Sequence, residues 1–195
     1  MKKKLYMMRH GQTLFNKLCL IQGWCDSPLT VRGQKQARIA KKYFQDHQIS
    51  FDRVICSTSE RCSDTLEIVT NQPYERYKEL KEMNFGTFEG APERLLPPLD
   101  LFFTYFKNFG GETIHEVSNR IYGKISSIME EEGNSILCVT HGGALRAFQL
   151  RFFNDSELRT MNCDNCAVFE YDYDTDTKQF EFVQAINHDF SQLED

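Results

Sequence analysis

The sequence has no apolar run near the roughly 20 residues that a membrane-spanning helix requires. It has no basic tract beyond the lysines at 2–4, and its formal net charge of −5 argues against nucleic-acid binding. Neither glycine-rich nucleotide-binding motif occurs, and there is no internal repeat. The remaining composition is that of a globular protein, so we expect one domain over residues 1–195, with neither membrane nor nucleic-acid partners.

The cysteines give little support for a disulfide or metal framework. There are seven, an odd number, and Cys56 and Cys138 fall in apolar runs typical of buried thiols. The chain start does not resemble a secretory signal, so we expect a cytoplasmic protein. Cys163 and Cys166 have the spacing of half a zinc site or a redox pair, but no second pair lies nearby. We expect no metal and no cofactor, with a redox or zinc protein as an alternative.

Strand and helix signals alternate along the chain, as in α/β proteins. Apolar runs predict strands at 5–8, 51–56 and 135–140, and helical periodicity predicts helices at about 30–47, 59–69, 114–133 and 142–153. Two alternating segments, 167–173 and 179–186, predict a hairpin at a sheet edge. We therefore expect a mostly parallel central sheet with an antiparallel addition at its edge.

Residues 74–111 are irregular, and we interpret them as an inserted flap. The segment holds Gly86 to Gly90, two prolines at 97 and 98, and an aromatic cluster formed by Phe102, Phe103, Tyr105, Phe106 and Phe109. These aromatic side chains could pack into the core along one amphipathic helix, contact a substrate, or do both.

Two histidines directly follow predicted strands. His10, flanked by Arg9 and Gly11, follows the first strand, and His141 follows the strand at 135–140. The carboxyl ends of strands in an open α/β sheet border the ligand crevice, so the two histidines meet there if their strands are neighbours. Histidine and arginine at such an edge indicate phosphate chemistry.

Five motifs in order resemble those of the histidine phosphatase superfamily, the phosphoglycerate mutase-like proteins. They are Arg9-His10-Gly11-Gln12-Thr13 with Asn16, Gly23 with residues 26–30 and Gly33, Ser57 through Arg61, Glu82 through Gly90, and Gly111-Glu112-Thr113 with Arg120 followed by His141-Gly142-Gly143. The resemblance spans most of the chain. It implies a three-layer α/β/α sandwich and an enzyme acting on a small phosphoester.

The resemblance implies that His10 is the nucleophile, and the chemistry of its side chain agrees. A neutral imidazole can attack phosphorus if its other nitrogen is held as a donor, for which a backbone carbonyl in the Gly11 turn is suited. Arg9 and Arg61 present planar donors to phosphoryl oxygens in place of a metal ion, and His141 adds a third donor if protonated.

Glu82 matches the catalytic acid of the family. To act near neutral pH it needs a raised pKa, after which the same carboxylate can activate water. Asn16, Gln22, Gly23 and Gly142 are expected to bind substrate, the last because helix amino ends favour anions. Glu112 and Arg120 are expected to be structural polar partners.

A phosphatase and a mutase are the two main alternatives within the family. The family's mutases carry Glu-Arg-His-Tyr-Gly where this chain has Glu82-Met83-Asn84-Phe85-Gly86, which favours a phosphomonoesterase. A weakly catalytic phosphate-ligand sensor on the same fold is a further alternative. The exposed edge of the predicted hairpin could support a homodimer.

Overall fold

The computed structural model describes residues 1–154, 157 and 161–193. Within them, six strands form one sheet in the order β3-β2-β4-β1-β5-β6. The strands are β1 (Lys2–Arg9), β2 (Arg53–Ser57), β3 (Glu75–Tyr77), β4 (Ser135–Thr140), β5 (Val168–Asp174) and β6 (Gln179–Ile186). Strands β1 to β4 pair in parallel, whereas β5 pairs antiparallel with both β1 and β6. The predicted mixed sheet with an antiparallel edge hairpin is confirmed.

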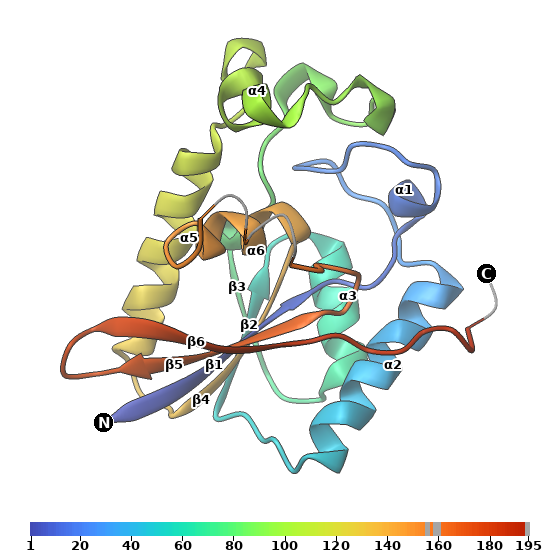
Figure 1. Ribbon diagram of the computed structural model, residues 1–195. Coiled ribbons are helices and arrows are strands. Elements are labelled where there is room, and N and C mark those ends of the chain that lie inside the picture. The colour runs from blue at the N-terminus through green and yellow to red at the C-terminus, as the bar shows by residue number, and fades with distance from the viewer. Residues whose placement is uncertain (155–156, 158–160, 194–195) are drawn as a thin grey trace.

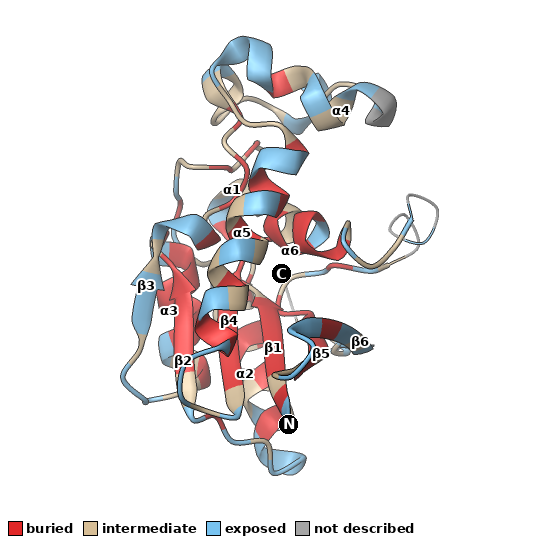
Figure 2. Cartoon of the chain, turned by 90° about the vertical axis from the view of Figure 1, so that its left-hand side faces the viewer, coloured by how far each residue is buried: buried red, intermediate tan, exposed pale blue. Residues whose placement is uncertain are grey.

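Helices cover both faces of the sheet, which gives the three predicted layers (Figure 1). The helices of the described chain are α1 (Leu14–Lys17), α2 (Val31–Asp46), α3 (Glu60–Val69), α4 (Leu99–Tyr105), α5 (Ile114–Met129) and α6 (Gly142–Gln149), of which α1 and α4 lie above the sheet. Helices α2 and α3 pack with one set of strand side chains, and α5 and α6 pack with the opposite set. The alternation of side chains along each strand therefore produces two separate cores, and Figure 2 shows the buried strands between them.

Local sequence explains where several helices begin and end. Thr30 caps α2 by accepting a hydrogen bond from Gly33 N, and Thr113 caps α5 in a reciprocal capping box with Glu116. Helix α6 ends at Gln149, four residues before the predicted end. No described helix is both long and apolar enough to span a bilayer.

The flap at 74–111 begins with an unpredicted strand, since Glu75–Tyr77 form β3 at the sheet edge. The remainder contains α4 and the short 3-10 turns Lys78–Leu80, Gly86–Phe88, Glu93–Leu95 and Phe106–Phe109. Its upper part lies beyond the carboxyl ends of the parallel strands (Figure 1). Backbone bonds between Ile21 and residues 90 and 91 join it to the loop after α1. The flap therefore stands over the sheet edge where the two histidines were expected.

Candidate active site

Strands β1 and β4 are direct neighbours, and this adjacency brings the two histidines together. Arg9 is in register with Thr140, and His10 N donates to Thr140 O at 3.0 Å. The rings of His10 and His141 lie edge to face with their centroids 5.4 Å apart. The structure thus confirms that residues more than a hundred positions apart meet at the carboxyl ends of these strands.

The hydrogen bonds of His10 define its tautomer. Nδ1 lies 2.8 Å from Gly11 O, and because a carbonyl can only accept, Nδ1 must carry the proton. Nε2 then keeps its lone pair and accepts from Arg61 Nε at 3.2 Å. Burial, followed by the charges of Arg61 and Arg9, lowers the pKa of His10 well below its ordinary value. The side chain is therefore a neutral imidazole with its lone pair on Nε2, where Arg61 donates to it.

Arg61 is fully buried at the start of α3. Its Nη1 donates to Cys25 O at 3.0 Å and to Asp26 Oδ1 at 2.8 Å, while Nη2 donates to Gly23 O at 2.9 Å. Four donated bonds, including the one to His10, fix the guanidinium beside the nucleophilic nitrogen. Asp26 supplies the compensating charge that a buried arginine needs.

Arg9 retains a donor without a partner. Its Nη1 donates to Cys163 O at 2.7 Å, but Nε is buried and has no hydrogen-bond partner in the described part of the chain. Gly142 packs closely beside it, since a Cβ there would lie 3.3 Å from Arg9 Nε. A buried N–H of this kind carries a desolvation cost that an anionic ligand would remove.

Glu82 is buried and held at the amino end of α6. Its Oε1 accepts from Met83 N and its Oε2 accepts from Gly143 N, each at 2.8 Å. The helix start that was expected to favour a phosphate therefore donates Gly143 N–H to a carboxylate of the protein itself. A Cβ at Gly143 would lie only 2.5 Å from Oε1, so a larger residue here would displace the Glu82 carboxyl group.

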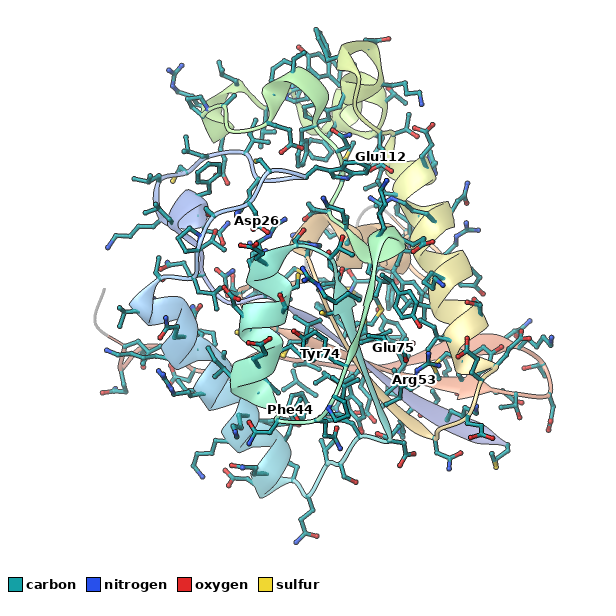
Figure 3. All side chains as sticks on the ribbon, turned by 180° about the vertical axis from the view of Figure 1, so that it is seen from behind. Asp26, Phe44, Arg53, Tyr74, Glu75 and Glu112 are labelled. Atoms are coloured by element: carbon teal, nitrogen blue, oxygen red, sulfur yellow. The ribbon has the colours of Figure 1, made fainter. Side chains whose placement is uncertain are left out.

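A third arginine, Arg120, holds the backbone that carries Glu82. Arg120 donates to the carbonyls of Glu79, Lys81 and Glu82 at 2.7 to 2.8 Å, and it forms two hydrogen bonds with Glu112 at 2.7 and 2.8 Å. Glu112 also accepts from Asn84 N at 2.9 Å. Figure 3 shows Glu112 and Asp26 between the sheet and the upper flap. Glu112 and Arg120 have the structural role predicted for them, and the residue they position is Glu82.

His141 packs against the ring of His10 and is fully buried. Its Nε2 is 2.8 Å from Ser57 Oγ and 3.5 Å from Cys62 Sγ. Burial, and then the charge of Arg61, lowers the pKa of His141 well below its ordinary value. The imidazole is therefore neutral in its protein surroundings, and a protonated donor requires an anion close by.

A cavity of about 740 Å³ opens beside these groups. Six of the predicted site residues line it, namely Arg9, His10, Asn16, Gln22, Glu82 and Gly142. Arg61 and His141 are not among the lining residues and instead contact or face His10. Three of the five predicted catalytic residues, Arg9, His10 and Glu82, thus line one cavity, while Gly23 does not line it.

Gly23 has a supporting position. Its N–H donates to Glu89 and its carbonyl accepts from Arg61. The Glu89 carboxylate also accepts from the backbone N–H groups of Trp24, Cys25 and Phe85, which fixes the loop around Arg61. Sequence reasoning did not assign Glu89 this role, although the residue lies inside the Glu82–Gly90 motif.

Asn16 and Gln22 are partly engaged by their own loop. Asn16 Oδ1 accepts from Thr13 N at 3.2 Å and from Asn165 Nδ2 at 3.3 Å. Gln22 bridges Thr13 and Ser27 through its oxygen and nitrogen, respectively. Asn165 also donates to His10 O and was not predicted as a site residue. These amides therefore shape the cavity wall next to the nucleophile.

All seven cysteines are free, and Cys163 and Cys166 are buried. Burial raises the pKa of both thiols. Cys163 lines the cavity, and its carbonyl accepts from Arg9. Among the described residues, no group of three or more histidine, cysteine or acidic side chains is arranged to hold a metal ion.

Comparison with known proteins agrees with this geometry. The family model of the histidine phosphatase superfamily, branch 1, matches residues 5–186. The chain belongs to this superfamily. Its members among the relatives include phosphatases and phosphoglycerate mutases, so the superfamily assignment identifies the protein as a phosphotransfer or phosphate-ester enzyme.

Three similar proteins illustrate both activities. The chain is 28% identical over 193 residues to the broad-specificity phosphatase YOR283W of Saccharomyces cerevisiae, covering 91% of this chain and 82% of the yeast protein. It is 26% identical over 226 residues to the 2,3-bisphosphoglycerate-dependent phosphoglycerate mutase of Buchnera aphidicola, and the match covers 93% of this chain and 98% of the mutase. The crystal structure of phosphoglycerate mutase from Bacillus anthracis matches with a TM-score of 0.80 at 25% identity, and the match covers 93% of this chain and 92% of the mutase chain. The predicted phosphoglycerate mutase-like fold is confirmed.

Proposed function

We propose that this superfamily member is a metal-independent phosphomonoesterase that hydrolyses a small phosphorylated metabolite through a phosphohistidine on His10. The observation that carries the proposal is the tautomer of His10, which leaves an uncharged Nε2 lone pair beside the arginines and close to Glu82. A phosphomonoester carries nearly two negative charges near neutral pH. A neutral nucleophile avoids the repulsion that an anionic one would meet.

The reaction takes place in two steps. First, the Nε2 lone pair is released from its hydrogen bond with Arg61 Nε and forms an N–P bond while the ester P–O bond breaks, and the leaving alkoxide takes a proton from Glu82. Arg9 Nε and Arg61 stabilise the charge that spreads over the phosphoryl oxygens. Glu82 then removes a proton from water, whose oxygen forms a new bond to phosphorus as the N–P bond breaks. His10 returns to its neutral form and inorganic phosphate leaves.

Phosphoglycerate mutase activity is the second candidate, because two of the similar proteins carry that name. The residue next to Glu82 favours hydrolysis. Met83 is buried and uncharged where the family's mutases have arginine, so the cavity lacks that cation for a second phosphoryl group. Water then competes more effectively for the phosphohistidine.

The test is phosphate release from a panel of phosphomonoesters with a chelator present. We expect release by the native protein and by His115→Ala, which changes an exposed histidine of α5, but none by His10→Ala. Loss of release on chelation, or full activity of His10→Ala, would contradict the mechanism. Label exchange between phosphoglycerates without phosphate release would identify a mutase.

A further inference from the structure

Most of the side chains that line the cavity beyond the groups around His10 are apolar. The flap contributes the largest side chains, and the loop after α1 and the start of α5 complete the surface. The apolar lining includes Leu20, Phe85, Leu96, Phe102, Phe103 and Ile114. Such a surface gains free energy by removing apolar ligand area from water.

The aromatic part of this wall is held in place from behind. Phe85 and Phe102 contact each other edge to face, and both contact Phe106, with ring centroids 4.8 and 5.4 Å away. Phe106 is fully buried. The aromatic cluster therefore both packs as a core and presents rings to the cavity, and little side-chain freedom remains to be lost on binding.

Polar groups are scarce away from the phosphoryl end. Asn16 and Gln22 lie beside His10 and already make bonds within their loop. The remaining charged lining residues, Glu93 and Arg146, are solvent-exposed. A polyol body such as a sugar would place hydroxyl groups against carbon, where each unpaired hydroxyl opposes binding.

We propose that the preferred substrates are phosphomonoesters of alcohols that carry an aromatic ring or a comparable hydrocarbon body. The phosphoryl group lies at His10 and Arg9, and the hydrocarbon lies against Phe85, Phe102 and Phe103. This substrate class rests on the proposed phosphomonoesterase function, since it concerns the alcohol part of the same ester.

The experiment compares esters of primary alcohols, whose leaving groups are chemically similar. We expect kcat/KM for 2-phenylethyl phosphate to exceed that for ethyl phosphate by at least about tenfold, because a ring is removed from water. Glycerol 3-phosphate and glucose 6-phosphate should be no better than ethyl phosphate. If kcat/KM for either polyol ester equals or exceeds that for 2-phenylethyl phosphate, the substrate class is overturned while the hydrolytic function remains intact. No release from any ester would instead refute the proposed function.

Variants locate the preference on the flap. Phe103→Ala should lower kcat/KM for 2-phenylethyl phosphate by about tenfold and that for ethyl phosphate by less than about threefold. Phe102→Leu keeps an apolar side chain against Phe106, and it should also lower kcat/KM for 2-phenylethyl phosphate more than that for ethyl phosphate. Phe109→Ala is the matched control, because Phe109 belongs to the same flap but does not line the cavity. If the ratio of kcat/KM for 2-phenylethyl phosphate to that for ethyl phosphate stays unchanged in both Phe103→Ala and Phe102→Leu, the proposed contact is contradicted.

Discussion

Replacement of Gly143 by alanine isolates the role of Glu82. A Cβ at this position would lie 2.5 Å from Glu82 Oε1 and 3.1 Å from Cδ, so the carboxyl group must move. It is the far end of a flexible side chain, and the backbone of α6 can remain in place. Misplacement by roughly 1 Å can reduce catalysis about 100-fold, equivalent to about 2.7 kcal/mol of barrier.

The loss should depend on the leaving group. Alkyl phosphates need a proton from Glu82, so we expect kcat/KM for Gly143→Ala to fall about 100-fold with them. p-Nitrophenyl phosphate, whose leaving group departs as an anion, should lose less than about fivefold. The free energy of unfolding should change by at most about 2 kcal/mol, since alanine favours the helix while one hydrogen bond is lost.

Two glycine variants provide the controls. Gly142→Ala places its Cβ 3.3 Å from Arg9 Nε, so it should reduce activity with both kinds of ester alike. Gly123→Ala lies in α5 with no atom within 4 Å of its Cβ and should leave activity unchanged. The assay is steady-state phosphate release, with thermal unfolding as the stability check. Equal losses for alkyl and nitrophenyl esters in Gly143→Ala would refute the assignment of Glu82 as the acid.

Three further predictions concern the surroundings of the site. Because the pKa of His141 is lowered on folding, the unfolded chain binds the proton more readily as pH falls below about 6.5, and stability decreases. In urea unfolding between about pH 5 and 7, the free energy of unfolding of the native protein should therefore fall with decreasing pH more steeply than that of His141→Gln, by about 1 kcal/mol per pH unit on average and approaching about 1.4 near pH 5. Parallel curves would count against a neutral buried His141. Arg120→Met should lower kcat/KM more for alkyl esters than for p-nitrophenyl phosphate, because three carbonyls around Glu82 lose their donor; a uniform loss would exclude positioning of the acid. Phe106→Ala should reduce the free energy of unfolding by about 3–5 kcal/mol in denaturant titrations, and a loss below about 1 kcal/mol would show that the cluster is poorly packed.

The main elements of the fold were predictable from local pattern. Isoleucines at helical spacing define α5, and alternating residues define the β5–β6 hairpin, because each element buries one face. Strand β3 escaped prediction because its three residues are exposed or half-exposed and have no apolar alternation. Among the described strands it pairs only with β2, and this pairing depends on the tertiary structure.

The sequence motifs named most of the residues that the structure brings together around His10, but not the hydrogen bonds that connect them. The donor bond from His10 to Gly11 O follows from neighbouring residues, so local reasoning found it. The bond from Gly143 N to Glu82 joins two segments 61 positions apart, and no local signal indicates it. The same holds for Arg120, whose three carbonyl acceptors lie about 40 residues earlier in the chain.

The most direct test of the mechanism is mass-spectrometric mapping of the phosphoenzyme in Glu82→Gln treated with p-nitrophenyl phosphate. This variant should still transfer the phosphoryl group from an ester with a good leaving group, while water attack is slowed. We predict one acid-labile phosphoryl group on His10, and none when His10→Ala is added. A phosphoryl group on another residue, or turnover without any phosphoenzyme, would contradict nucleophilic catalysis by His10.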